Sequence, residues 1–442
     1  MRMTPNGFPN RKVSLSPHMV RFDTLKDWLS WQEKSHPLTI DLGLERVAKV
    51  YKALNPSGAK PLTITVAGTN GKGSCIAYLE AIYLAQGYRV GAYTSPHILK
   101  YNERIKIGGI PISDDKICQA FERIERVRNN TSLSYFEFGT LAALDIFSRA
   151  NLDIQLLEVG LGGRLDAVNI VEPDVAIISS IGIDHVAWLG ETREAIGYEK
   201  AGIFRASVPA IVGDPLPPNS LIQVASDKDA CFYALGKDFG YTKQQNDWEW
   251  FSGARRINRL PEPALKGEHQ YRNASAVIMA TVQLADRLPV DGQSIQTGLE
   301  NVQLPGRFQL IDGTVPVLLD VGHNPEAVRT LVEYLTQNFP NRRIHAIFSM
   351  MKDKDIAEVL RIMNPVVCNW FFAPLTNARA ATEALMREIF SQQAMLNVSF
   401  GYTGFVDAFA AAKQQAREGE LLLVFGSFFL VSDCLAEFQN GR

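Results

Sequence analysis

From about residue 60 onward, short runs of strand-forming residues alternate with stretches of helical character. The first run is PLTITVAG (61–68), followed by a predicted helix over residues 74–86 and a second strand in YRVGAYTS (88–95). Two further apolar runs of strand length are DIQLLEVG (153–160) and DVAIISSIG (174–182). Strands that alternate with helices are typical of domains built on a parallel sheet. The alternation therefore predicts an α/β fold.

A second series of the same kind follows a Pro-Gly pair. The stretch from about 205 to 265 mixes short strands with turns and gives little information on the fold. Further along, a helical pattern stops in NVQLPGRFQLIDG (301–313). Four later runs, VPVLLDVG, RIHAIFSM, NWFFAPL and LLLVFGS, each precede a helical stretch, as in a doubly wound domain. We place the boundary near residue 303, between an N-terminal domain (1–303) and a smaller Rossmann-like α/β domain (304–442).

Charge and cysteine content limit the partners and the compartment. The 45 basic and 47 acidic residues leave a formal charge of −2, without the basic excess that DNA or anionic membranes attract. The 5 cysteines are widely spaced and form no C-x-x-C pair, which indicates a reducing compartment. No apolar run reaches the roughly 18 residues of a membrane helix. We expect a cytoplasmic protein that binds neither nucleic acid nor membrane, with residues 1–20 as a loose lead-in.

The strongest local signal is a glycine-rich loop between the first strand and the first helix. Glycines let backbone N–H groups converge on phosphate oxygens, and the helix N-terminus adds partial positive charge. The usual spacing G-x-x-x-x-G-K-[ST] is not kept, because Gly73 separates Lys72 from Ser74. A glycine-rich turn with a solvent-facing lysine is the alternative, but a turn alone does not require a lysine between two glycines. The loop predicts a P-loop ATPase domain, with the segment Gly68-Thr69-Asn70-Gly71-Lys72-Gly73-Ser74 as its phosphate site.

Three side chains near strand ends are candidate magnesium ligands. Ser95 follows the second strand, Glu158 ends the run DIQLLE, and His185 follows the fourth strand. Each alone could be a turn serine, a solvated acid or a hydrogen-bonded histidine. Together, at the same end of one parallel sheet as the P-loop, they predict a metal site. A dinucleotide fingerprint that begins at Gly160 is disfavoured, because the position that should be glycine is Leu165.

Seven motifs in order carry a resemblance to a known family. They are GTNGKGS (68–74), TSPH (94–97), LEVGLGGRLDAVN (157–169), DHVAWLG (184–190), EKAGIF (199–204), PGR (305–307) and DVGHNP (320–325). The series resembles the folylpolyglutamate synthase family of the Mur ligase superfamily, from about residue 41 to the C-terminus. The resemblance implies an ATP-dependent amide ligase. The γ-phosphate moves to a substrate carboxylate, and the amine of L-glutamate then attacks the acyl phosphate.

The resemblance also implies the nucleotide and metal residues. ATP and two Mg²⁺ ions are implied, one ion near Ser74 and the other on Ser95, Glu158 and His185. Lys200 matches a lysine that is carbamylated in this superfamily, and a surface helix lysine is the alternative. His323 is expected near the nucleotide or the reacting phosphate, and closure about residues 303–307 should assemble the site. The expected ATP contacts are Thr69, Asn70, Gly71, Lys72, Gly73, Ser74, Asn273 (adenine), Arg307 (phosphates) and Asp320 (ribose).

The segment TIDLGLERV (39–47) resembles one that helps bind dihydropteroate in bifunctional members of the family. The acceptor contacts implied in this way are Asp41, Leu42, Gly43, Leu44, Ser134, Tyr135, Phe136, Glu137, Leu165, Asp166 and Ala167. We expect 7,8-dihydropteroate, tetrahydrofolates and L-glutamate as substrates of a monomer. A tail-lengthening synthase, a peptidoglycan-precursor ligase and a nucleotide-dependent switch are the weaker alternatives. Residues 374–381 lack the Pro-Arg-Gly-type sequence of relatives, so glutamate contacts stay unassigned, as do chain length and folate form.

Overall fold

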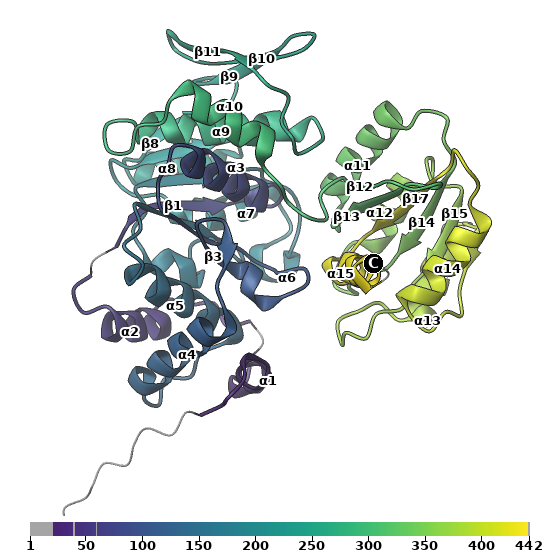
Figure 1. Cartoon of the computed structure of the whole chain (residues 1–442), viewed down its shortest axis with the longest axis horizontal. Helices are drawn as coiled ribbons and strands as arrows, with labels where there is room; N and C mark the ends of the chain where they lie inside the picture. Colours follow the sequence, from purple (N-terminus) through teal and green to yellow (C-terminus); the bar gives the residue numbers. More distant parts are fainter. Residues whose placement is uncertain (1–20, 39, 59, 441–442) are drawn as a thin grey trace, which may run out of the picture.

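The computed structural model describes residues 21–38, 40–58 and 60–440. The predicted lead-in (1–20) and Thr39 of the TIDLGLERV segment lie outside the described residues. Figure 1 shows two α/β bodies, a larger one formed by the purple-to-green part of the chain and a smaller one formed by the light green and yellow part.

An eight-stranded sheet forms the larger body. Its strands are β1 (Leu62–Ala67), β2 (Val90–Tyr93), β3 (Ile105–Ile107), β4 (Ile110–Pro111), β5 (Ile154–Glu158), β6 (Val175–Ile178), β7 (Pro209–Val212) and β8 (Cys231–Ala234). The spatial order is β4-β3-β2-β5-β1-β6-β7-β8. In this order, every pair of neighbouring strands from β2 through to β8 is parallel. The β2–β3 and β3–β4 pairs are antiparallel. Val66 pairs with Glu158 and Ala67 with Ile178, so the carboxyl ends of β1, β5 and β6 meet at one edge.

Helices cover both faces of this sheet. They are α1 (Leu25–Ser35), α2 (Glu45–Leu54), α3 (Lys72–Ala85), α4 (Asp114–Arg128), α5 (Tyr135–Ser148), α6 (Val186–Leu189), α7 (Arg193–Lys200), α8 (Asn219–Asp227), α9 (His269–Gln283) and α10 (Gly292–Asn301), with 3-10 turns η1 (Tyr101–Arg104), η2 (Ala167–Ile170) and η3 (Ala201–Ile203). Helices α3, α9 and α10 share one core with β1, β2 and β5. A second core joins α1, α2, α4 and α5, around Trp28 and Phe121.

The stretch that indicated little in the sequence, residues 205–265, contains β7, α8, β8 and a small antiparallel sheet. That sheet has the order β11-β10-β9, with β9 (Gly240–Lys243), β10 (Trp248–Ser252) and β11 (Arg255–Leu260). Trp248 and Trp250 of β10 are fully buried in the core that also holds α9. In Figure 1 the three strands lie at the top of the larger body, beyond α9 and α10.

A six-stranded sheet forms the smaller body. Its strands are β12 (Gln309–Ile311), β13 (Val317–Asp320), β14 (Ile344–Phe348), β15 (Asn369–Phe372), β16 (Val398–Ser399) and β17 (Leu421–Phe425), in the order β12-β13-β17-β14-β15-β16. Only β12 is antiparallel to its neighbour among these strands. The helices are α11 (Pro325–Asn338), α12 (Ile356–Met363), α13 (Glu383–Gln392), α14 (Phe405–Gln415) and α15 (Phe428–Asn440). Two apolar cores flank the sheet, one on each face.

The predicted fold class is confirmed, because a mainly parallel α/β sheet in the larger body is followed along the chain by a second, smaller one. The first predicted helix begins at Lys72, two residues earlier than the expected residue 74. Within the described residues, no helix is both long and apolar enough to cross a bilayer.

Candidate active site

The glycine-rich loop follows β1 and passes directly into α3. Gly68 has φ +149°, and a Cβ there would lie 2.0 Å from the hydroxyl of Ser179, which follows β6. Gly71 has φ +86°, a left-handed conformation that favours glycine. Ser180 fixes the loop, because its hydroxyl accepts from the Asn70 N–H at 3.1 Å. The first turn of α3 therefore points its N–H groups, which lack intrahelical partners, out of a rigid loop.

Two lysines reach the same carbonyl of this loop. Lys72 Nζ and Lys200 Nζ each donate to Gly68 O at 3.0 Å, although Lys200 comes from the end of α7. Burial lowers the pKa of Lys72, and the negative charge of Glu158 opposes that shift. Burial and the positive charge of Lys72 lower the pKa of Lys200 to about 7. A substantial fraction of Lys200 is therefore a neutral, nucleophilic amine at neutral pH.

The three candidate metal ligands border one cavity, as the strand-end argument predicted. The Ser95 N–H donates to Glu158 Oε2 at 3.2 Å. Burial raises the pKa of Glu158, while Lys72 opposes the shift. His185 follows β6 in a left-handed conformation with φ 53°, and burial lowers its pKa to about 4, which leaves a neutral imidazole.

These three side chains fill only part of the coordination sphere of a divalent cation. Among the described residues there is no group of three or more His, Cys, Asp or Glu side chains arranged for a metal. Ser95, Glu158 and His185 offer one hydroxyl, one carboxylate and one imidazole. This donor set suits a hard divalent cation that also takes oxygens from phosphate or water.

A cavity of about 880 Å³ lies between the two bodies and takes in most of the expected nucleotide residues. It is lined by Asn70, Gly71, Ser74, Asn273, Arg307, Asp320 and His323, among others. Asn273 is tied to the P-loop helix, because Gln270 accepts from it at 3.1 Å and donates to the Ser74 hydroxyl at 3.3 Å. Asp320 is buried and accepts from the N–H groups of Gly322 and Phe308 at 2.7 and 3.3 Å.

A second cavity, of about 500 Å³, takes in the expected acceptor residues together with the metal candidates. Its lining includes Asp41, Leu42, Gly43, Thr69, Lys72, Gly73, Ser95, Ser134, Tyr135, Phe136, Glu137, Glu158, Leu165, Asp166, Ala167, His185 and Lys200. Asn70, Gly71, Arg307 and His323 border both cavities, so the two spaces meet at the P-loop. Leu44 is the N-cap residue of α2 and does not line either cavity.

The three acceptor segments are joined by local contacts. The Gly43 N–H donates to Leu165 O at 3.2 Å, which connects segment 41–44 with segment 165–167. Arg46 contacts Asp41 at 2.8 Å and Glu137 at 3.1 Å, which connects the first segment with α5. Burial raises the pKa of Asp166 to about 6, although hydrogen bonds from backbone N–H groups act in the opposite direction and lower it.

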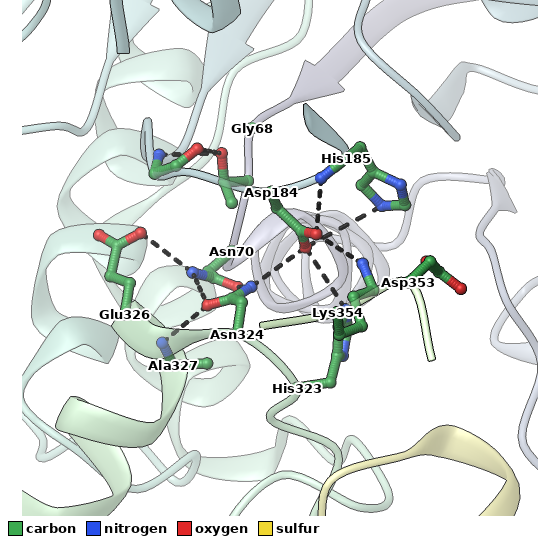
Figure 2. Close-up of polar contacts among 12 residues, drawn as sticks. Gly68, Asn70, Asp184, His185, His323, Asn324, Glu326, Ala327, Asp353 and Lys354 are labelled. Carbon is green, nitrogen blue, oxygen red and sulfur yellow. Dashed lines mark hydrogen bonds and ion pairs between the residues drawn. The ribbon is translucent and has the colours of Figure 1, made fainter. Parts of the chain in front are cut away.

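Sequence reasoning missed a polar cluster between the two bodies, centred on Asp184 (Figure 2). Lys354 Nζ, on the loop before α12, lies 2.5 Å from Asp184 Oδ1, and both side chains are buried. Asn324 Nδ2 donates to Asp184 at 3.3 Å and to Asn70 of the P-loop at 2.9 Å. Burial alone would raise the pKa of Asp184, but His323 and the charge of Lys354 hold it well below its ordinary value. Asp184 and Asn324 stand inside motifs, whereas Lys354 had no signal in the sequence.

Two family models match separate parts of the chain. The Mur ligase middle domain matches residues 66–281, and the glutamate ligase domain of Mur ligases matches residues 306–428. A curated protein of Escherichia coli (strain K12) named dihydrofolate synthase/folylpolyglutamate synthase is 41% identical over 418 residues, which is 95% of this chain and 96% of that protein. The chain belongs to the dihydrofolate synthase/folylpolyglutamate synthase family. The predicted family and enzyme class, an ATP-dependent amide ligase, are confirmed.

Other members of the dihydrofolate synthase/folylpolyglutamate synthase family are similar to the chain over nearly its whole length. The relative with this name from Haemophilus influenzae is 37% identical, over 92% of this chain and 96% of its own. A solved structure described as E. coli FolC in complex with DHPP and ADP has a TM-score of 0.89 and 40% identity, and covers 95% of this chain and 99% of its own. A bifunctional enzyme of Yersinia pestis complexed with AMPPNP and Mn ion has a TM-score of 0.87 and 41% identity, over 94% and 98%.

Proposed function

We propose that the chain adds L-glutamate to 7,8-dihydropteroate, which makes dihydrofolate, and adds further glutamates to tetrahydrofolates through an acyl-phosphate intermediate. The observation that carries this function is the second cavity. There the P-loop lysine, the metal candidates and the three expected acceptor segments face one space. Relatives that share 41% and 37% identity with the chain bear both activities in their names. The chain is thus an ATP-dependent ligase that forms a carbon–nitrogen bond.

ATP and a divalent cation serve this reaction, as in the related structures with ADP, AMPPNP and Mn. We propose two Mg²⁺ ions, one near Ser74 and the other on Ser95, Glu158 and His185. When bound, the cations neutralise charge on the transferring phosphoryl group. The state of His185 supports this assignment, because burial lowers its pKa to about 4 and the imidazole is therefore neutral at pH 7, with a lone pair for a cation.

The P-loop and the smaller body hold the nucleotide from two sides. The N–H groups of residues 69–73 and the Lys72 ammonium bind the β- and γ-phosphates. Arg307 and His323 face the same space from the smaller body and orient the reacting phosphate. The N–H bonds that Asp320 accepts fix its carboxylate for the ribose, and Asn273 contacts the adenine. Positioning and charge neutralisation then carry the phosphoryl transfer.

Lys200 is proposed to carry a carbamate. Formation of a carbamate needs a neutral amine, and burial lowers the pKa of Lys200 to about 7. The modification would convert a buried cation beside Lys72 into an anion. The resulting charge reversal relieves repulsion between the two ammonium groups and supplies an oxygen ligand for a cation.

The acceptor is proposed to lie along the segments 41–44, 134–137 and 165–167, with its carboxylate toward Glu158. The cavity supports this placement, because the acceptor segments and the metal candidates border the same space. L-glutamate is the second substrate, and it is named in a related structure with Mn and AMPPNP. The attacking amine displaces phosphate from the acyl phosphate and leaves an amide.

The domain boundary, the oligomeric state and the compartment complete the proposal. We place the domain boundary near residue 303, with a hinge at 303–307, and we propose a monomeric cytoplasmic enzyme that binds neither nucleic acid nor membrane. All 5 cysteines are free, which supports a reducing compartment. Small-angle scattering with and without ATP and acceptor tests the hinge, and identical profiles would contradict it.

The experiment that tests the function is phosphate release from Mg-ATP with L-glutamate. The acceptor is either 7,8-dihydropteroate or tetrahydrofolate. Turnover with both establishes the bifunctional ligase. Turnover with tetrahydrofolate alone indicates a tail-lengthening synthase. Phosphate release without any acceptor indicates a nucleotide-dependent switch, and no release under any condition contradicts the proposal.

A further inference from the structure

Arg104 is a buried cation at the wall of the second cavity that no step of the proposed mechanism uses. It ends η1 and is 9% exposed, although its side chain lines the cavity. Its Nε donates to His97 Nδ1 at 2.8 Å. Because an arginine N–H only donates, that ring nitrogen must accept, and the ring is therefore neutral in this arrangement. The hydrogen bond orients the guanidinium without neutralising its charge.

Within the described residues, Arg104 forms no ion pair. The acid that precedes it in the sequence, Glu103, accepts hydrogen bonds from the backbone N–H groups of Ile98, Leu99 and Lys100, at 2.7, 2.9 and 2.7 Å. By contrast Lys106, two positions along on β3, pairs with Glu80 at 3.5 Å. The charge of Arg104 acts on Glu158, which lines the same cavity, but the two side chains form no ion pair. Burial of a guanidinium without an ion pair is costly, and an anion bound in the cavity would lower that cost.

The surroundings of Arg104 indicate where that anion sits. The guanidinium carbon lies 5.6 Å from the ring centroid of Tyr135, on the acceptor segment 134–137, and 5.4 Å from that of Tyr101. The backbone of Arg104 accepts from the Thr94 N–H at 2.9 Å, one residue before Ser95. Arg104 therefore lies between an expected acceptor segment and the loop that carries a metal candidate.

We propose that Arg104 is a substrate-binding residue whose guanidinium receives a carboxylate of the pterin-bearing acceptor. The inference rests on the proposed function. In 7,8-dihydropteroate the carboxylate is the single one on the aryl ring, which is the group to be activated. In tetrahydrofolate it belongs to the terminal glutamate. A guanidinium presents a planar, two-pronged donor set that matches a carboxylate, and a lysine at this position would not.

The test compares acceptors with and without the carboxylate. Dissociation constants are measured for the full chain with 7,8-dihydropteroate, with tetrahydrofolate, and with the dihydropteroate analogue in which hydrogen replaces the carboxyl group. The variants are Arg104→Gln, Arg104→Lys as the conservative change, and Lys106→Gln as the matched control. Thermal unfolding of each variant, measured in parallel, checks that it is folded.

For the wild type we expect removal of the carboxylate to weaken binding by about 10-fold to 100-fold. Arg104→Gln should lose most of that difference while its affinity for the carboxylate-free analogue stays within about twofold. Arg104→Lys should be intermediate, and Lys106→Gln should match the wild type. If Arg104→Gln loses affinity for dihydropteroate, Arg104 binds the aryl carboxylate. If it loses affinity for tetrahydrofolate alone, Arg104 binds the glutamate carboxylate.

Two results would overturn the inference in different ways. If Arg104→Gln weakens the analogue and the carboxylate-bearing acceptors by the same factor, Arg104 only shapes the cavity through Tyr135 and His97. If the wild type binds none of the three pterin compounds, the proposed function fails, and the role of Arg104 fails with it.

Discussion

Replacement of Lys354 by Met tests whether the two bodies are held together by the Asp184 cluster. Lys354 pairs with Asp184 across the boundary, with side chains only 7% and 9% exposed. Met keeps the apolar stem of the lysine and removes its charge. The change therefore leaves a buried carboxylate with a weaker set of partners, on the loop that also carries His185.

The free-energy cost of Lys354→Met depends on the hydrogen-bond partners that Asp184 retains. Loss of one partner from a buried ion pair costs about 3–5 kcal/mol. Asp184 still accepts from the His185 N–H at 2.7 Å and from Asn324 at 3.3 Å, which limits the loss. We expect a cost of about 2–3 kcal/mol to the closed arrangement, and hence a fall in kcat/KM for L-glutamate of about 30-fold to 150-fold.

The assay is amide formation at saturating ATP and acceptor, with the free energy of unfolding measured separately for each variant. A double-mutant cycle of Lys354→Met with Asp184→Asn should give a coupling of about 1–3 kcal/mol, because the two side chains are in direct contact. Arg387→Gln is the matched control. Arg387 pairs with Glu383 on α13, where 55% and 33% of the two side chains are exposed, and such a pair contributes about 0.5 kcal/mol or less.

The reasoning is refuted if Lys354→Met retains kcat/KM within about twofold of the wild type, or if the double-mutant cycle shows additive losses. Either result would mean that the charge pair is a neighbour contact without a role in closure. Equal losses for Lys354→Met and Arg387→Gln would point to general destabilisation.

Three further predictions concern the larger body. The folded chain keeps the pKa of Lys200 near 7, against 10.5 ordinarily, so folding releases a proton at neutral pH and this costs stability. In CO₂-free buffer, Lys200→Met should therefore raise the free energy of unfolding in urea by up to about 4 kcal/mol at pH 7 and by about half of that at pH 9. The same variant should lose ligation activity. An unchanged stability at pH 7 would contradict this. Gly68→Ala should lower the free energy of unfolding by about 2 kcal/mol or more, because the new Cβ would lie 2.0 Å from a serine oxygen. Gly73→Ala is the control and should unfold like the wild type, because no atom lies nearer than 3.9 Å to its Cβ position. Equal effects of the two substitutions would refute the argument. Arg46→Gln should raise the KM for dihydropteroate about 10-fold and leave the KM for ATP unchanged, because it releases Asp41 from α5; parallel rises in both constants would refute a local role.

The fold was predictable wherever strands are buried on both faces. The strands β6 and β17 are continuous apolar runs, and β1 and β5 are mainly apolar strands whose few polar side chains are also buried. Runs of this kind are typical of a parallel sheet that is covered on both faces. The interval 205–265 was not predictable in this way. Its strands β9 and β11 are largely exposed, and the helix α8 is short, so neither period stands out from the turns around it.

The sequence by itself determined the position and type of the parallel strands, the glycine-rich phosphate loop, and the strand-end residues Ser95, Glu158 and His185. It did so because each depends on residues close together in the chain. Only the tertiary structure decided that Lys354 would meet Asp184, 170 positions earlier, and that Arg104 would line a cavity while forming no ion pair with any described residue. Contacts of that kind arise from how two sheets and their loops pack, and a charged residue in a loop has the same local pattern whether it faces water or a substrate.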